Sequence, residues 1–265
     1  MDLGLADARV VVTGGASNIG RGIVHAFAAE GARIVISDID GPQAEKVRAE
    51  ATELGASEVN VVIADLTTPG AAEEAVGGAQ TAWGGLDVLV NNAGWSVPGF
   101  IASDTDRHKW QRTIEINLFT AIAATQAAIP AMKGADGPAI VFIASDAAFG
   151  QIRQGVYGAS KAAMVALART TAREHGRHGI RSNVVCPGLV IPEGPEAIGA
   201  SSLWAVGQDA VFDQNQIDFM LKDTPLRRLT TAEDIGRAVV WFSSPCAARQ
   251  VTGQLISVSG GYTMP

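Results

Sequence analysis

Tyr157 and Lys161 have the types and the spacing of a pair that exchanges protons. They stand four residues apart at the start of a helical pattern, so both side chains should lie on one face of the helix, one turn apart. A phenol has an unperturbed pKa of about 10, too high for proton exchange at neutral pH, but a nearby ammonium group favours the phenolate. The pair therefore predicts a general acid/base. The alternative is that the two side chains are simply exposed on an amphipathic helix.

A glycine-rich turn near the start of the chain has the composition of a phosphate-binding site. The segment TGGASNIG at 13–20 follows an apolar run and opens a helical pattern. Glycines in such a turn let the backbone approach a pyrophosphate at the helix N-terminus, although many turns between strand and helix are glycine-rich for steric reasons alone. This segment therefore indicates a dinucleotide only together with a second feature.

Asp38 supplies that feature. It ends the next apolar run, eighteen residues beyond Gly20, near the spacing of about 20 at which a carboxylate binds the adenosine ribose. A 2′-phosphate would be repelled by the carboxylate, and neither Ser17 nor Ile39 offers a cation. The sequence therefore predicts NAD as cofactor, with a solvated loop aspartate as the alternative for Asp38.

These features belong to an ordered set of motifs. The chain carries, in this order, TGGASNIG, NNAG at 91–94, EINL at 115–118, AIVFIAS at 139–145, YGASK at 157–161 and PG at 187–188. Short-chain dehydrogenases/reductases show the same motifs in the same order, and the chain resembles that family over nearly its full length. The resemblance implies an oxidoreductase that transfers a hydride between NAD(H) and a secondary alcohol or ketone.

The resemblance also implies roles for four catalytic residues. Tyr157 is the acid/base, Lys161 binds the nicotinamide ribose as well, Ser145 holds the substrate oxygen, and Asn117 supports a water in a proton relay. Ser145 lies twelve residues before Tyr157, one fewer than is common in the family, which a deletion in the intervening loop explains. Asn117 interrupts an apolar helical pattern, where an unpaired amide would cost roughly 1–3 kcal/mol; a structural amide bonded to backbone is the alternative.

The implied cofactor site extends over several segments. Asn18 stands where the family usually has its middle glycine, and Asn tolerates left-handed geometry better than most residues. Pro192 stands where a Thr often contacts the carboxamide, so Val190 backbone is expected to carry that recognition alone. The expected cofactor-binding residues are Gly14, Ser17, Asn18, Ile19, Gly20, Asp38, Asp65, Leu66, Asn91, Ala93, Gly94, Tyr157, Lys161, Pro187, Gly188 and Val190.

The elements that position these residues can be read from hydrophobic patterning. Longer helical patterns alternate with short apolar runs at 9–14, 33–38, 59–65, 86–94, 139–145, 181–188 and 254–261. This alternation, with short connections, predicts a Rossmann-like, doubly wound, seven-stranded parallel sheet flanked by helices. From 107 to 133, Trp110, Ile114, Leu118 and Ile122 form a stripe expected to pack on the sheet. Ligands should bind at the carboxyl ends of the strands.

The length allows one large α/β domain or two small ones, and because no linker or repeat divides the chain we expect one domain over 1–265. The resemblance implies a mainly cofactor-binding half at 1–95 and a catalytic half at 96–265. A net charge of −7 without a basic block argues against nucleic acid. Cys186 and Cys246 lack metal-ligand spacing, so we expect no metal, reduced thiols and a cytoplasmic location. An acidic N-terminus and the lack of an apolar run of about 18 residues argue against a membrane.

The segment at about 190–228 corresponds to the substrate lid of relatives. It is apolar enough to line a pocket for a bulky or cyclic substrate, although its side chains could equally only pack the lid on the body. No carboxylate-binding Arg is evident in the pocket segments, and basic residues that would dock a carrier protein are few around 132–137. The expected substrate residues are Trp95, Ser145, Gln151, Trp204 and Phe212.

The sequence leaves two alternative functions open and suggests an oligomeric state. A 3-oxoacyl reductase acting on carrier-protein or CoA substrates is the main alternative. A non-catalytic NAD-sensing regulator is a remote one, because it would not need Ser145, Tyr157 and Lys161 together. Relatives pair the helices that match 107–133 and 156–176, and the second is rich in alanine, so we expect a homotetramer, with a dimer as second choice.

Overall fold

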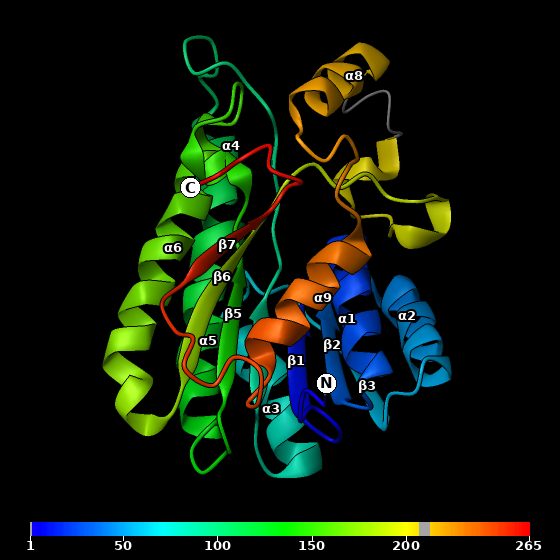
Figure 1. The fold of residues 1–265 in the computed structure, drawn as a ribbon, viewed down its shortest axis with the longest axis vertical. Helices are drawn as coiled ribbons and strands as arrows, with labels where there is room; N and C mark the ends of the chain where they lie inside the picture. Colours follow the sequence, from blue (N-terminus) through cyan, green and yellow to red (C-terminus); the bar gives the residue numbers. More distant parts are fainter. Residues whose placement is uncertain (1, 207–212) are drawn as a thin grey trace.

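The computed structural model describes residues 2–206 and 213–265. Its centre is a parallel sheet of seven strands in the order β3-β2-β1-β4-β5-β6-β7 (Figure 1). All seven apolar runs are strands, as expected, and the order reverses beside β1, as in a doubly wound sheet. The strands are β1 Arg9–Thr13, β2 Arg33–Asp38, β3 Glu58–Ile63, β4 Val88–Asn91, β5 Ala139–Ile143, β6 Arg181–Pro187 and β7 Leu255–Val258.

Helices cover both faces of the sheet, which is why the central strands are apolar without alternation. In β1, Val10 and Val12 belong to one buried cluster and Val11 to the other. The first cluster includes α1 (Ile19–Ala29), α2 (Gly41–Glu53) and α9 (Ala232–Ser243). The second includes α3 (Ala71–Trp83), α5 (Thr120–Ala131) and α6 (Gly155–His175).

The stretch expected as one helix at 107–133 has three parts. α4 (Arg107–Ile114) leads into a π-helical turn, Glu115–Phe119, before α5. The stripe of Trp110, Ile114, Leu118 and Ile122 does not form its buried face, so that expectation was wrong. Small residues face the sheet instead, because they let the helix backbone approach it closely, and the larger side chains lie half-exposed on the flank. The buried face comprises Thr113, Asn117, Thr120, Ala121, Ala124, Thr125 and Ala128.

The same stretch bears on the expectation that the sequence holds no membrane-length run. Arg107–Ala131 has 25 helical residues and a mean hydropathy of 1.2, enough by length and composition to cross a membrane. Core helices of soluble proteins have the same property. Here Ala121, Ala124 and Ala128 are buried in the cluster that packs on the sheet.

Loops that follow the carboxyl ends of the strands meet at one edge of the sheet, at the top of Figure 1. The segment between β6 and α9 crosses the same edge. It contains short 3-10 turns at Pro195–Ala197 and Leu203–Val206, followed by α8 (Gln214–Asp223). This is the expected lid region, and Phe212 within it lies outside the described residues.

Candidate active site

The glycine-rich turn after β1 is shaped by close approaches that exclude side chains. Gly14 has φ +61°, and a Cβ there would lie 2.9 Å from Ala93 Cα. A Cβ on Gly20 would overlap the carbonyl oxygen of Gly14. Asn18 adopts φ 42°, so the asparagine does occupy a positive φ, as its place in the turn suggested. The turn thus leaves a cradle of bare backbone at the start of α1, as a pyrophosphate requires.

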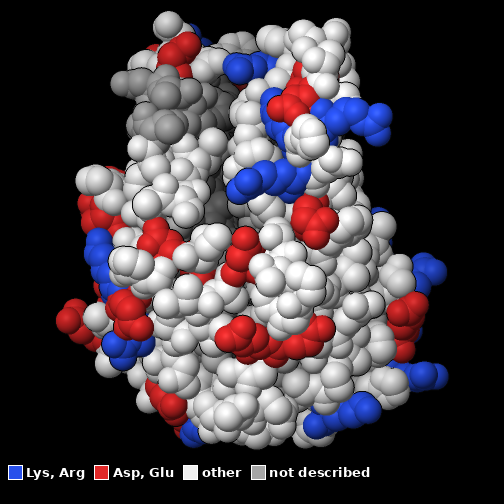
Figure 2. All heavy atoms as spheres, turned by 180° about the vertical axis from the view of Figure 1, so that it is seen from behind, with Lys and Arg blue, Asp and Glu red and all other residues white. Residues whose placement is uncertain are grey.

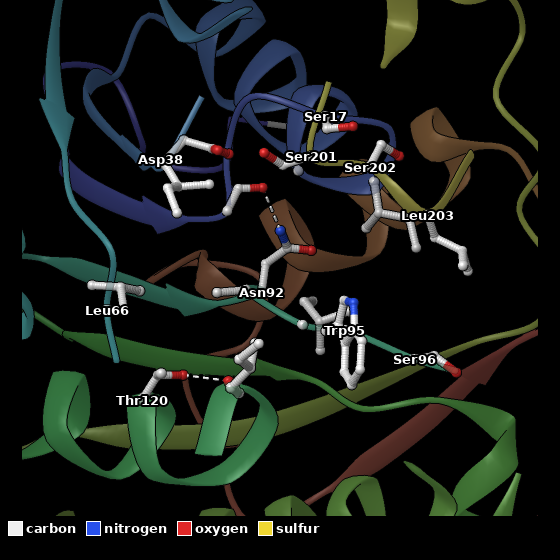
Figure 3. Close-up of a pocket in the computed structure, with 18 of the residues that line it drawn as sticks. Ser17, Asp38, Leu66, Asn92, Trp95, Ser96, Thr120, Ser201, Ser202 and Leu203 are labelled. Carbon is white, nitrogen blue, oxygen red and sulfur yellow. Dashed lines mark hydrogen bonds between the residues drawn. The ribbon is translucent and has the colours of Figure 1, made fainter. Parts of the chain in front are cut away.

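Asn92, rather than the expected Asn91, holds this turn in place. Its Nδ2 donates to the carbonyl oxygens of Thr13 at 3.0 Å and Gly14 at 2.7 Å. Figure 3 draws one hydrogen bond from this amide as a dashed line. Asn91 points to the opposite side of the sheet and donates to Thr125 Oγ1 at 3.0 Å. The assignment of Asn91 to the cofactor site was therefore wrong, because neighbouring residues at a strand end point to opposite faces.

Asp38 lies at the end of β2, as expected, beside the glycine-rich turn. Its Oδ2 accepts the Ala16 N–H at 2.9 Å, and its Oδ1 accepts the Asp40 N–H at 3.0 Å. Partial burial raises the pKa of Asp38 above its usual value, and the two backbone donors oppose that rise. Figure 3 shows its carboxylate across the pocket from Trp95, on the side where Ser17, Ser201 and Ser202 gather.

A pocket of about 730 Å³ joins this cradle to the residues expected to react. Its volume suits a dinucleotide or a drug-sized molecule. Of the expected site residues in the described chain, four do not line it: Asn91, Asn117, Gln151 and Val190. Those that do are Gly14, Ser17, Asn18, Ile19, Gly20, Asp38, Asp65, Leu66, Ala93, Gly94, Trp95, Ser145, Tyr157, Lys161, Pro187, Gly188 and Trp204.

Tyr157, Lys161 and Ser145 converge at one end of the pocket. The Lys161 Nζ donates to the Ile143 carbonyl oxygen at 2.8 Å and lies 5.8 Å from the centre of the Tyr157 ring. The Ser145 side chain lies close enough to Tyr157 to lower the pKa of its hydroxyl, against the larger effect of burial. The two α6 residues therefore share one face, and that face meets the end of β5.

The pKa values of this group differ from the simple expectation. Burial raises the pKa of Tyr157 to about 12 and lowers that of Lys161 to about 8. Desolvation disfavours the charged form of each group, and here it exceeds any stabilisation of the phenolate by the ammonium. Lys161 alone therefore does not make Tyr157 a base at neutral pH in the protein without bound molecules.

Asn117 is buried in the π-helical turn and forms three hydrogen bonds. Its Oδ1 accepts the Trp95 N–H at 2.7 Å, and its Nδ2 donates to the Trp95 carbonyl oxygen at 2.9 Å and to Ser160 Oγ at 3.0 Å. A Cβ on Gly94 would lie 3.3 Å from Asn117 Oδ1 and 3.2 Å from Lys161 Nζ. The amide thus has the structural role that was the alternative, at a place adjacent to Lys161.

Three comparisons with known proteins agree with this geometry. A family model described as enoyl-(acyl carrier protein) reductase matches residues 14–263. D-beta-hydroxybutyrate dehydrogenase of Cupriavidus necator is 32% identical over 254 residues, which are 95% of this chain and 96% of that protein. The chain belongs to the short-chain dehydrogenase/reductase family. It is an oxidoreductase that acts on the CH–OH group of secondary alcohols or on the corresponding ketones.

Two further relatives of this short-chain dehydrogenase/reductase have larger substrates in their names. (2S)-[(R)-hydroxy(phenyl)methyl]succinyl-CoA dehydrogenase of Thauera aromatica is 33% identical over 264 residues, which are 99% of each chain. A solved structure described as 7α-hydroxysteroid dehydrogenase complexed with NADH and 7-oxo glycochenodeoxycholic acid has a TM-score of 0.87 and 32% identity. It covers 98% of this chain and 96% of that chain.

The lid of this family member is bonded to its cofactor cradle. The Asn18 N–H donates to the Ala197 carbonyl oxygen at 2.7 Å, and the Ala200 N–H donates to Asp40 Oδ2 at 2.7 Å. Asn18 Nδ2 also donates to the Val190 carbonyl oxygen at 3.2 Å. Val190 is therefore buried behind the pocket wall rather than lining it, and its carbonyl is already engaged.

The substrate end of the pocket agrees only in part with the expected residues. Trp95 and Trp204 line it, whereas Gln151 lies to one side and accepts a hydrogen bond from the Tyr262 hydroxyl at 3.5 Å. The sequence analysis missed Arg112, which lines the pocket with its guanidinium over the Trp95 ring, 5.4 Å from the ring centre. It lies within the helical pattern of 107–133, and only the packing of α4 on the loop after β4 brings it to the pocket.

The surface charge and the thiols add little to the site. On the face drawn in Figure 2, basic side chains are scattered among acidic ones rather than gathered in a stripe. Cys186 is buried and Cys246 is exposed, and both are free. The described residues contain no cluster of His, Cys, Asp or Glu that could hold a metal ion.

Asp146 is a further residue that the sequence analysis missed. It follows Ser145, is 8% exposed, and accepts a hydrogen bond from the Ser145 hydroxyl at 3.3 Å. Burial raises its pKa from 3.8 to about 6, although the hydrogen bond from Ser145 opposes the rise. Its signal in the sequence was a carboxylate directly after a buried strand and beside the expected catalytic serine.

The raised pKa predicts how Asp146 affects stability. A carboxyl group whose pKa is raised in the folded state stabilises the protein below its unfolded pKa, and this contribution is lost as pH rises through the folded value. Asp146→Asn should therefore increase the free energy of unfolding relative to wild type, by about 2 kcal/mol more at pH 8 than at pH 4.5. Urea unfolding at both pH values measures it, with the exposed Asp136→Asn as control. An equal difference at both pH values would refute the raised pKa.

Proposed function

We propose that this chain catalyses hydride transfer between NAD(H) and a bulky or cyclic, apolar secondary alcohol or ketone, with Tyr157 as the acid/base. The observation that carries the proposal is one pocket that joins the bare cradle of the glycine-rich turn and Asp38 to the hydroxyls of Tyr157 and Ser145. The bound nicotinamide would supply or accept the hydride. The chain's own residues would orient the reacting carbon and exchange the proton of its oxygen.

Each reacting side chain has a role that its contacts support. In ketone reduction, the Tyr157 hydroxyl donates its proton to the carbonyl oxygen while Ser145 donates a hydrogen bond to the same atom. In alcohol oxidation, Tyr157 takes the proton back. Lys161, whose Nζ donates to the Ile143 carbonyl oxygen, would hold the nicotinamide ribose and favour the phenolate. Asn117 holds the Trp95 backbone and would support a proton-relay water beside Lys161.

The cofactor half supports NAD over NADP. The Asp38 carboxylate is fixed by two backbone N–H groups, so it can accept hydrogen bonds from ribose hydroxyls without moving. A 2′-phosphate at the same place would bring two like charges together. Residues that line the cradle and support this binding are Gly14, Ser17, Asn18, Ile19, Gly20, Asp65, Leu66, Ala93, Gly94, Pro187 and Gly188.

Apolar residues of the pocket support the proposed substrate class. Trp95, Leu203 and Trp204 add flat and branched apolar surface to the pocket that Ser145 and Tyr157 line. The relative named for a hydroxysteroid is consistent with a cyclic substrate. An acyl-CoA thioester is the second candidate, because Arg112 lines the pocket and one relative is named a succinyl-CoA dehydrogenase. Rates with cyclohexanone, camphor, a 7-oxo steroid and acetoacetyl-CoA would separate the two classes.

We also propose a homotetramer, one domain over 1–265 and a cytoplasmic location. The support for assembly is the surface that a lone chain leaves open. Phe119 is 51% exposed at the start of α5, and on α6 the alanines at 159, 162 and 166 are exposed. Small side chains on an exposed helix face let a second helix approach closely, and apolar flanks favour its burial.

The acid/base assignment predicts the effect of removing one oxygen atom. Tyr157→Phe keeps the ring but removes the proton, and general acid/base contributions are typically 10²- to 10⁴-fold. Turnover should fall by at least about a hundredfold, while the NAD dissociation constant from fluorescence titration changes little. In wild type, alcohol oxidation should accelerate as pH rises and the Tyr157 phenolate becomes populated, and the variant should lack this rise. Lys161→Ala should damage both turnover and NAD binding. A Phe variant with more than about a tenth of wild-type turnover would contradict the assignment.

The cofactor assignment predicts a change in preference. Asp38→Ala removes both the ribose acceptor and the repulsion of a 2′-phosphate, so the ratio of kcat/KM for NAD to that for NADP should fall by about tenfold or more. Steady-state rates with both dinucleotides measure this ratio. The exposed Asp136→Ala serves as control and should leave it unchanged. A wild-type preference for NADP, or an unchanged ratio in the Asp38 variant, would overturn the assignment.

The assembly proposal predicts that charge on the exposed face of α6 separates the subunits. Ala166→Arg places a guanidinium where a second helix should pack, so light scattering should give a smaller mass than for wild type. Ala6→Arg, at another exposed alanine, should leave the mass at four chains. A wild-type protein that is fully active as a dilute monomer would refute the tetramer.

A further inference from the structure

Asp146 has unusual surroundings for an acidic side chain. It begins a 3-10 turn, Asp146–Phe149, at the end of β5, and it is 8% exposed. Within the described part of the chain, it forms no ion pair with a Lys or Arg side chain. Its carboxylate accepts a hydrogen bond from the Ser145 hydroxyl. A buried carboxylate without a cation is costly to ionise, so its charge depends strongly on this donor.

The proton of the Ser145 hydroxyl is committed in this arrangement. A serine hydroxyl has one proton to donate and two lone pairs to accept with. One lone pair accepts the Ala147 N–H at 3.1 Å, and the side chain also lowers the pKa of Tyr157, against the larger effect of burial. Its proton is directed to Asp146 Oδ1 at 3.3 Å. The proton that Ser145 would offer to a substrate oxygen is therefore the one that Asp146 holds.

We propose that Asp146 is a positioning residue whose protonation decides whether Ser145 can donate its proton to the reacting oxygen. The proposal rests on the function proposed above and adds a residue and a pH dependence to it. When Asp146 is ionised, the charged acceptor keeps the Ser145 proton. When Asp146 is protonated, its own O–H can donate to the second lone pair of Ser145, and the Ser145 proton is free.

The other titratable groups around Asp146 have pKa values above the range from pH 5 to 7.5. The helix α6 brings Tyr157, whose pKa is about 12, and Lys161, whose pKa is about 8 and whose Nζ is bonded to Ile143. Strand β6 brings Cys186, whose pKa burial raises to about 12. The C-terminal segment brings Tyr262, whose pKa is also raised and which faces Asp223 as well. Asp146 itself has a pKa of about 6.

This arrangement predicts a particular pH profile for ketone reduction. Tyr157 stays protonated throughout the range, so the proton donor does not change. The rate of hydride transfer from NADH to a ketone should be highest below about pH 6 and should fall by about tenfold or more toward pH 7.5. The fall has this size because the reacting oxygen loses the hydrogen bond from Ser145, and one such donor typically changes a reaction rate by at least this factor.

Single-turnover oxidation of bound NADH by cyclohexanone and by camphor, from pH 5 to 7.5, tests the proposal. Asp146→Asn should abolish the inflection and keep the low-pH rate at every pH, because the amide donates to Ser145 as the protonated acid does. Asp146→Ala, which has no acceptor, should also give a flat profile, and it serves if the Asn variant does not fold. A buried residue with only a structural role would lower the rate at all pH values instead.

A double-mutant cycle shows whether Asp146 acts through Ser145. In a Ser145→Ala background, Asp146→Asn should have no effect on the profile, because the proton that it controls is gone. An inflection that persists in the Asp146→Asn variant would overturn the proposal. So would an inflection that is still present in Ser145→Ala but disappears when Asp146→Asn is added. If wild type with NADH reduces none of cyclohexanone, camphor and acetoacetyl-CoA, the proposed function itself fails. That result differs from a failure of the Asp146 proposal, in which reduction occurs but its pH profile is not the expected one.

Discussion

One hydrogen bond inside the protein links the helix that carries the acid/base to the strand that carries its partner. Lys161 Nζ donates to the Ile143 carbonyl oxygen at 2.8 Å, and Lys161 is 3% exposed. A buried ammonium needs such an acceptor, because an unpaired charge in the interior is strongly disfavoured. The bond places α6 over the end of β5, and this brings Tyr157, one turn earlier, against Ser145. The relative position of the reacting groups depends on this contact.

Burial also explains the electrostatics of the group. It raises the pKa of Tyr157 and Asp146 and lowers that of Lys161, so each is driven toward its neutral form. At neutral pH Lys161 is still mostly protonated and Asp146 mostly ionised, so the site holds opposite charges that burial makes costly. The site becomes responsive to any charge that enters the pocket, because electrostatic interactions are stronger where water is excluded. Perturbed pKa values of opposite direction in one pocket are typical of acid/base sites.

Much of the fold and of the site could be predicted from the sequence. The seven strands were visible because buried parallel strands are apolar on both faces, and Asp38, Ser145 and Tyr157 were visible because their motifs follow strand ends or begin a helix. Features that depend on packing were not. Asn91 and Asn92 are equivalent as a pattern, and only the direction of each side chain shows that Asn92 holds the turn. The π-helical turn, which replaces a regular stripe with small residues, has no periodic signal. Nothing in the sequence distinguishes Asp146 from a solvated carboxylate after a strand, and only the structure shows that it is buried.

The central claim is that Tyr157 exchanges the proton and that its ionisation depends on charge brought to a buried site. A tyrosinate absorbance titration of wild type and Tyr157→Phe, each with and without NAD, tests it directly, because the chain contains only one other tyrosine, Tyr262. The difference between the two proteins should titrate near pH 12 without NAD and at a clearly lower pH with NAD bound. A difference titration that stays at the same pH in both conditions would contradict the account.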